Sequence, residues 1–306
     1  MPHAEASRQA PATALDPHLA HPLAASVRAV DRAVSLLSFQ TLADADLSAG
    51  GGAPWIRCDH ALSAPAFFQR WRAMAAQLLV RRPGCIPEQS APHSAVPPKT
   101  TGGYVLQWYL IIPSYFGGLL FHTARRVPEL APSRLAFRLD HAVLRDVGLR
   151  PGRFWCLPDD PDAEHPDAMP VPDEAALGAT LRRQVTAHAT EFLAVYSPQL
   201  RVGNRTQWAT VTDVLDSAML LAGRSFGSPQ AGAADAQLVL GAGEKPLTSG
   251  STICQVTDDR GRTHWTRLRG SCCFLYALPG VTDPCASCPR NGEDERAHIF
   301  GTIDPA

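Results

Sequence analysis

Apolar side chains recur at three- and four-residue spacing in several stretches of the chain, and this period predicts amphipathic helices. The predicted helices span Ala24–Leu42, Ser63–Val80, Thr100–Arg125, Asp173–Tyr196, Trp208–Leu221 and a shorter Ala231–Leu240. The side chains expected to face inward in three of these helices are Val27, Val30, Val34 and Leu37; Phe67, Trp71, Met74 and Leu78; and Leu177, Leu181, Val185 and Phe192. Asp173 stands where an N-cap belongs, because its carboxylate can accept the free backbone N–H groups of the first turn.

The most apolar stretch of the chain runs from Tyr104 to Phe121 and contains Gln107, Pro113 and two adjacent glycines. It barely reaches the ~20 apolar residues that a membrane-spanning helix requires. Proline removes a backbone donor and disrupts a helix interior. We therefore expect a buried core helix that is broken at Pro113, and no transmembrane segment.

A period of two replaces the helical period in two regions, which indicates strands. Leu135–Leu157 alternates in short runs around glycine and proline, and Ser249–Cys273 reads as two strands joined by a turn at Asp259-Arg260-Gly261. Between these regions, Asp159–Pro172 is an acidic, proline-rich loop. Together with the helices, these patterns predict an α+β protein with a mostly helical body and small antiparallel β elements.

Composition narrows the possible partners and the compartment. The 306 residues carry a formal net charge of -1, so the chain lacks the basic field that nucleic-acid binding requires. The first 22 residues are rich in Ala, Pro and His without the basic and apolar pattern of a secretory signal, so we expect a disordered tail over residues 1–22. Without an export signal, the expected compartment is the reducing cytoplasm, where clustered cysteines indicate metal or redox chemistry.

Four of the eight cysteines crowd into seventeen positions, as the adjacent pair Cys272-Cys273 and the turn Cys285-x-x-Cys288. Thiolates are the ligands of iron–sulfur clusters, with four for a [2Fe–2S] centre, and this chemistry is favoured here. Adjacent residues of a strand point to opposite faces, so joint ligation requires a bend, which Gly270 would permit. The alternatives are a structural zinc site, although zinc usually takes two Cys-x₂₋₄-Cys pairs, and a thioredoxin-type redox pair, which lacks its βαβ context. The scattered cysteines are expected to be buried apolar residues, with Cys254 the nearest substitute ligand: Cys58, Cys85, Cys156 and Cys254.

The segment from Arg269 to Pro289 resembles the C-terminal signature of the ferric-siderophore reductases, the FhuF-like family. The shared elements are the pair Cys272-Cys273, the run "FLYALPG", and Cys285-x-x-Cys288, with eleven residues between the pairs where about ten is usual in that family. The stretch "RVGNRTQWATVTDVL" (Arg201–Leu215) is similar to a Gly-Asn segment that opens a late helix in the family, with Val202 where tryptophan is common. The apolar helix with Gln107 and Trp108 also looks similar.

The resemblance implies a cytoplasmic protein that holds a [2Fe–2S] cluster on the four cysteines and reduces Fe(III) in an imported siderophore. It divides the chain into the tail, an α-rich siderophore-binding body over residues 23–265 and a cluster-binding motif over residues 266–292. Because no P-loop and no dinucleotide glycine fingerprint is found, we expect a separate electron donor, a ferredoxin or a flavoprotein. The alternative function is an iron–sulfur or siderophore-binding sensor without turnover.

Ferric siderophores are bulky and some are anionic, so we expect aromatic and cationic side chains around the substrate. The candidates near the cysteine motif are Arg262, Trp265, Arg267 and Arg269, and those from the helical body are Trp108, Tyr109, Asn204, Arg205 and Trp208. The simpler interpretation is that the arginines solvate a hairpin and that Trp108 and Tyr109 belong to the core.

Overall fold

The computed structural model describes residues 21–44, 46, 53–80, 96–278, 281 and 285–303. The expected tail over residues 1–22 lies almost wholly outside this range, as does Cys85. The helices are α2 Pro22–Ala33, α3 Cys58–Ser63, α4 Ala66–Val80, α5 Pro98–Ala124, α6 Glu174–Tyr196, α7 Asn204–Ser225, α8 Pro229–Leu240 and α9 Glu293–Ile303. Short 3₁₀ turns cover Pro132–Arg134, Ser197–Gln199 and Leu275–Ala277. The predicted class, α+β with a mostly helical body, is confirmed.

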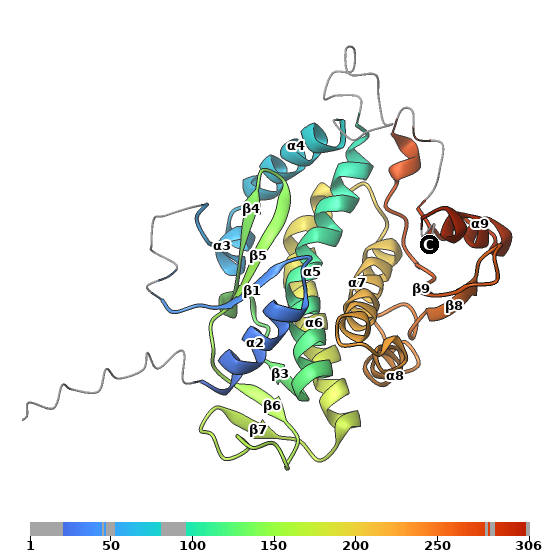
Figure 1. Cartoon of the computed structure of the whole chain (residues 1–306). Coiled ribbons are helices and arrows are strands. Elements are labelled where there is room, and N and C mark those ends of the chain that lie inside the picture. The colour runs from blue at the N-terminus through green and yellow to red at the C-terminus, as the bar shows by residue number, and fades with distance from the viewer. Residues whose placement is uncertain are drawn as a thin grey trace, which may run out of the picture.

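Helix α5 is the centre of the fold, with α4, α6 and α7 packed along it and α2 crossing near its C-terminal half (Figure 1). By length and composition it is the one helix in the described part of the chain that could cross a membrane, but 78% of its most apolar window is buried in the protein. α5 is therefore a core helix, as expected. The predicted break is wrong, because the helix continues through Pro113. Proline removes a single ladder bond, and the buried side chains on both sides of Pro113 hold the two halves in line.

Two other helix predictions need correction. The first helix ends at Ala33 and not at Leu42, because the Asp31 carboxylate accepts the Phe39 N–H at 2.7 Å and the chain turns into strand β1 (Ser38–Thr41). In α4 the buried face is shifted by one residue: Phe68, Trp71, Ala75 and Leu79 are buried, whereas Leu78 is exposed. α5, α6 and α8 begin and end close to the predicted residues, α7 extends beyond the predicted Trp208–Leu221 at both ends, and α3 and α9 were not predicted. The Asp173 carboxylate accepts the Ala176 N–H at 2.7 Å as the N-cap of α6.

Three small sheets flank the helices. The first has the order β1-β5-β4-β2, where β2 is Ile56–Arg57, β4 Leu135–Asp140 and β5 Val143–Leu149, and β1 runs parallel to β5. The second has the order β3-β6-β7, with strands Arg126–Pro128, Phe154–Cys156 and Ala168–Pro170. The third is the antiparallel hairpin of β8 (Ile253–Thr257) and β9 (Thr263–Arg267), which confirms the predicted pair of strands and its turn.

The C-terminal hairpin and α9 lie together on one side of the helical body, next to α7 and α8 (Figure 1). Close backbone contacts bring the helices of this side together. A Cβ on Gly232 of α8 would lie 2.4 Å from the Met219 carbonyl oxygen of α7, so only glycine fits. A Cβ on Gly118 of α5 would lie 2.9 Å from the Ala218 Cβ of α7. These crossings hold α7 as the support on which the cysteine motif rests.

Candidate metal centre in the C-terminal motif

The four predicted ligand cysteines lie in two segments at the end of the hairpin. Cys272 and Cys273 follow β9, and Cys285 and Cys288 form a turn before α9 in which the Cys288 N–H donates to the Cys285 carbonyl at 2.8 Å. The Asn291 side-chain amide donates to the same carbonyl at 3.1 Å. The Cys-x-x-Cys turn is thus closed by its own backbone and held from outside by Asn291.

A buried carboxylate on α7 fixes the entry into the first segment. Asp213 accepts the Gly270 N–H at 2.9 Å, the Ser271 N–H at 2.8 Å and the Ser271 hydroxyl. The Arg269 guanidinium lies 3.7 Å from this carboxylate and also donates to the Gln107 side chain of α5 at 3.2 Å. The chain therefore leaves β9 through a turn that is bonded to α7 and α5, directly before Cys272.

Beyond the cysteine pair, the backbone bends at Phe274, which adopts the left-handed conformation with φ 58°. The Thr100 hydroxyl of α5 donates to the Phe274 carbonyl at 3.0 Å and holds this bend. The chain therefore bends twice, at Gly270-Ser271 as expected and again at Phe274, where positive φ is costlier than at a glycine. Cys273 packs in a small apolar cluster with Leu79, Val96, Leu275 and Leu278, against which Cys285 also rests.

The thiols of the two segments influence one another's ionisation. The hydrogen bond between the Cys285 and Cys273 thiols lowers the pKa of Cys273 and raises that of Cys285. Burial raises the pKa of Cys272, and Cys273 and Cys288 contribute to this shift as nearby charges. The charge of Arg269 lowers the pKa of all three of Cys272, Cys273 and Cys285. The thiols of Cys273 and Cys285 thus join the two segments, and thiols are the donor type that thiolate-bound metal centres use.

The substrate candidates around the hairpin separate into different environments. Arg267 and the strand around Trp265 border an open pocket beside the Cys285–Cys288 turn. Arg269 is buried against Asp213, and Arg262 bonds Asp258 at 2.8 Å in the hairpin turn. Arg269 is therefore a positioning residue for the cysteines, and Arg262 stabilises the turn, whereas Arg267 keeps its place as a substrate candidate.

The candidates from the helical body are also divided. Tyr109 is fully buried in the core, where its hydroxyl lies 3.1 Å from His188 Nε2, so the prediction that it contacts a substrate is wrong. Trp108 is half-buried between Trp71 and Tyr104, the latter of which packs against the Cys273 cluster. The first turns of α7 carry the exposed Asn204 and Arg205 and the half-buried Trp208.

The described cysteines outside the motif are free thiols. Cys58 and Cys156 are buried, as expected for small apolar residues, and burial raises the pKa of both. Cys254 lies on β8 opposite Thr266, and its ionisation is affected by burial, Arg296 and Asp216 and by none of the four motif cysteines. The role of substitute ligand therefore has no support in its surroundings.

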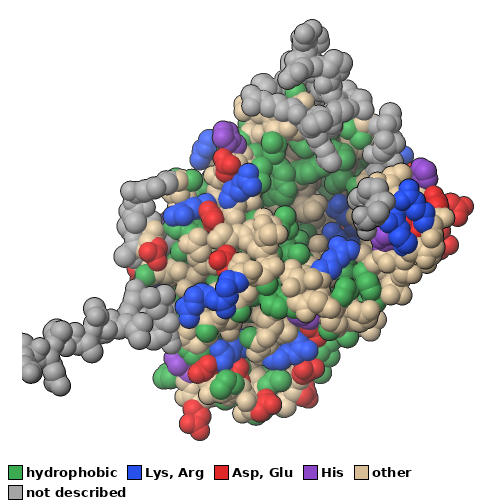
Figure 2. Space-filling model, in the orientation of Figure 1, with side chains coloured by type: hydrophobic (Ala, Val, Ile, Leu, Met, Phe, Trp, Pro, Cys, Tyr) green, Lys and Arg blue, Asp and Glu red, His purple; other side chains and the backbone are tan. Residues whose placement is uncertain are grey.

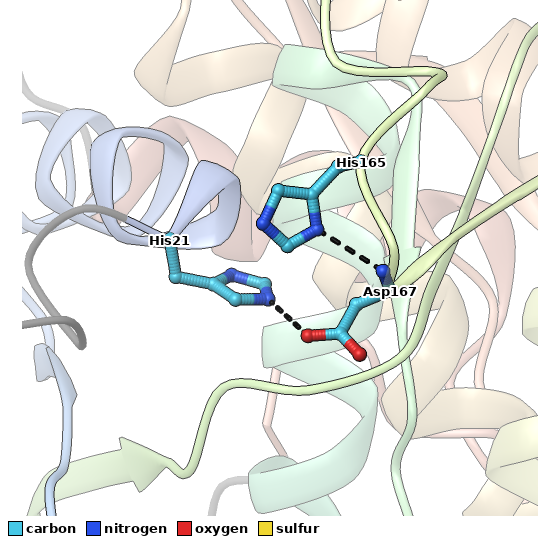
Figure 3. Close-up of side chains that lie close together, drawn as sticks. All are labelled: His21, His165 and Asp167. Atoms are coloured by element: carbon cyan, nitrogen blue, oxygen red, sulfur yellow. Dashed lines mark hydrogen bonds and ion pairs between the residues drawn. The ribbon is translucent and has the colours of Figure 1, made fainter.

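Among the described residues, the group of metal-binding residue types whose ligand atoms all lie within 4.8 Å of one another is His21, His165 and Asp167, next to the start of α2 (Figure 3). The Nδ1 of His21 accepts the Leu23 N–H at 3.1 Å, and the Nδ1 of His165 accepts the Asp167 N–H at 3.1 Å. Each ring therefore carries its proton on Nε2, which donates to Asp167 at 3.3 Å in the case of His21. A histidine that binds metal through Nε2 donates its other N–H instead. Because the Nδ1 of His21 accepts the Leu23 N–H in the first turn of α2, we assign His21 the role of N-cap of that helix.

The sequence patterns did not predict the roles of Asp213 and Asn291 at this site. Asp213 carries a detectable signal, because it is a carboxylate on the apolar face of a predicted helix, where charge is rare without a partner. Asn291 offers none, since its role depends on a fold of the chain after Cys288.

In comparisons with known proteins, no family model and no curated protein matches this chain.

Proposed function

We propose that the chain is a ferric-siderophore reductase that holds a [2Fe–2S] cluster on Cys272, Cys273, Cys285 and Cys288. The observation that supports the proposal is the contact between the two cysteine segments, in which the Cys273 and Cys285 thiols are hydrogen-bonded to each other and the charge of Arg269 acts on both. When bound, a [2Fe–2S] cluster would supply one electron at a time at a potential that its surroundings tune.

The residues around the thiols have the roles that such a site requires. Asp213 and Thr100 fix the backbone on either side of Cys272 and Cys273, and Asn291 fixes the Cys285 turn. The apolar cluster of Leu79, Val96, Leu275 and Leu278 excludes water from one side of the site. The Arg269 guanidinium favours the thiolate forms that ligate metal.

One-electron chemistry suits the release of iron from a siderophore. Siderophores hold Fe(III) through hard oxygen donors and hold Fe(II) far more weakly, so one electron lowers the affinity greatly. Each tenfold difference in affinity between the two states corresponds to about 59 mV for a one-electron couple. The pocket beside the Cys285–Cys288 turn would bring the chelate near the ligand thiols. A ferredoxin or flavoprotein of the cytoplasm would supply the electron, and the free thiols of the described cysteines suit that compartment.

The proposal is tested on protein purified without oxygen. We expect brown protein with equal amounts of iron and acid-labile sulfide, whose absorbance is bleached by dithionite and returns on addition of a ferric siderophore. Ferrozine should then trap Fe(II) in proportion to the electrons delivered. Binding without Fe(II) would favour a sensor, and colourless protein with one zinc per chain would overturn both iron proposals.

The ligand assignment is tested with matched cysteine variants. Cys285→Ser should lose colour and Fe(II) production together, because a serine hydroxyl is a poor substitute for a thiolate. Cys254→Ser is the control, since Cys254 lies on β8 apart from the four thiols. An unchanged spectrum in Cys285→Ser contradicts the assignment.

A further inference from the structure

A pocket of about 350 Å³ opens beside the Cys285–Cys288 turn. Its walls come from α5, α7, β9, the cysteine turn and α9, and include Tyr115, Ser217, Arg224, Arg267, Ser287 and Phe300. Figure 2 shows the molecular surface hollowed on the side of α7 and the C-terminal segment, with Lys or Arg side chains at the hollow. Small-ligand sites are concave and have volumes of roughly 300–1,000 Å³, so the pocket is large enough for a compact chelate.

Two arginines in this pocket lack a carboxylate partner. Arg267 donates to the Asp213 carbonyl oxygen at 2.8 Å, and Arg224 donates to the Trp265 carbonyl oxygen. Within the described residues, neither guanidinium forms an ion pair, whereas Arg125, Arg126 and Arg134 each do. Each of the two side chains is thus oriented by one backbone carbonyl and keeps further N–H groups for a ligand.

The two carboxylates whose charge acts on Arg267, Asp213 and Asp216, have hydrogen-bond partners of their own. Asp213 is bonded to Gly270 and Ser271 and pairs with Arg269, and Asp216 accepts from Ser251 and Thr252. Burial, followed by the like charge of Arg269, lowers the pKa of Arg267. Asp213 and Asp216 offset part of the Arg267 charge from a distance, but within the described residues no carboxylate forms an ion pair with Arg224 or Arg267 inside the pocket.

We propose that this pocket binds anionic ferric chelates, such as catecholate or carboxylate complexes, in preference to neutral or cationic ones. The inference rests on the proposed function, because it assigns the substrate class of the same site. Arg224 at the exposed rim attracts the anion, and Arg267 deeper in the pocket donates to its oxygen atoms. The hydroxyls of Tyr115 and Ser217, which lie 3.2 Å apart, provide further donors to a chelate oxygen. The ligand is then held against Ser287, inside the Cys-x-x-Cys turn.

Redox-inert gallium complexes separate binding from electron transfer. Equilibrium dialysis with gallium analysis compares two complexes of similar size, trianionic tris(catecholato)Ga(III) and neutral tris(acetohydroxamato)Ga(III). We expect the trianion to bind at least about tenfold more tightly, the factor associated with one hydrogen bond to a charged group. Arg224→Gln and Arg267→Gln should each weaken binding of the trianion by about tenfold and leave the neutral complex unaffected.

Matched variants exclude a general loss of charge or fold. Arg70→Gln removes an exposed arginine of α4 that does not line the pocket, and should bind as the unmodified protein does. Arg267→Lys keeps the charge and should retain part of the preference. Equal affinity for both gallium complexes, or equal weakening in Arg70→Gln, overturns the inference.

The two proposals fail in different ways. Charge-selective gallium binding without Fe(II) production would support the anion pocket and contradict the reductase proposal. Fe(II) production without charge-selective binding would support the reductase proposal and contradict the anion pocket.

Discussion

The substitution Asp213→Asn tests whether α7 positions the cysteine pair. Asparagine preserves the shape of the side chain but removes the charge, and its amide nitrogen cannot accept the N–H groups of Gly270 and Ser271. Asp213 forms three hydrogen bonds to these two residues and is almost fully buried. Its removal also leaves the buried Arg269 without the carboxylate 3.7 Å away.

The magnitude follows from these contacts. A hydrogen bond to a charged group contributes about 1.5–3 kcal/mol, and at least one of the three must be lost. Removing one partner of a buried ion pair costs about 3–5 kcal/mol when the other charge remains. Because the two effects share one carboxylate, we expect a loss of about 3–4 kcal/mol and not their sum. That is a large part of the ~5–15 kcal/mol that stabilises an ordinary domain.

The assay combines urea unfolding of metal-free protein with iron analysis after anaerobic reconstitution. The control is Asp216→Asn, a second buried carboxylate of α7 whose three hydrogen bonds go to Ser251 and Thr252 before β8. Burial raises the pKa of Asp216, so a neutral side chain is less costly there. We expect Asp213→Asn to lose most of its iron and Asp216→Asn to retain it. Asp213→Asn with stability within about 0.5 kcal/mol of the unmodified protein and full iron content would refute the reasoning.

Three further predictions concern the body of the fold. Burial lowers the pKa of His188 to about 4, below the 6.5 of an exposed histidine. As the pH falls, the unfolded state therefore takes up the proton first, and the free energy of unfolding should fall by about 3 kcal/mol between pH 6.5 and 4. Urea unfolding at several pH values measures this loss, and His188→Gln should make the free energy of unfolding less dependent on pH. His21→Ala removes the cap of α2 and should cost about 1 kcal/mol with no change in metal content by mass spectrometry; metal loss would instead indicate a ligand. Gly232→Ala places a Cβ 2.4 Å from the Met219 carbonyl oxygen. The helices α7 and α8 must then move apart, which should lower the free energy of unfolding by about 1–3 kcal/mol in thermal unfolding. Gly227→Ala is the control: its Cβ would meet no neighbour, but its φ is positive, so the loss should be about 1 kcal/mol.

Much of the fold follows from local sequence patterns. The apolar period of 3.6 identifies α5, α6, α7 and α8, and alternation identifies the hairpin of β8 and β9. The spacing of Cys272, Cys273, Cys285 and Cys288 is enough to favour thiolate ligation of a metal over other chemistry. These features depend on residues near one another in the chain, so they can be recognised without knowledge of tertiary contacts.

The sequence patterns fail where distant contacts decide the outcome. The helix through Val34 stops early because Asp31 and the pairing of β1 with β5 favour a strand, and α5 continues through Pro113 because burial on both sides holds it. Helical period locates the apolar face of α4 only to within a residue, and packing against α5 selects Phe68 over Phe67.

The same division applies to the candidate site. The sequence by itself determined the four candidate thiols and their spacing, because these are properties of a seventeen-residue segment. Only the tertiary structure decided that Asp213, 59 positions before Cys272, holds that segment, that Arg269 is buried against Asp213, and that Arg224 and Arg267 share a pocket. The physical reason is that a charged side chain has no defined role until folding selects its partners and removes its water.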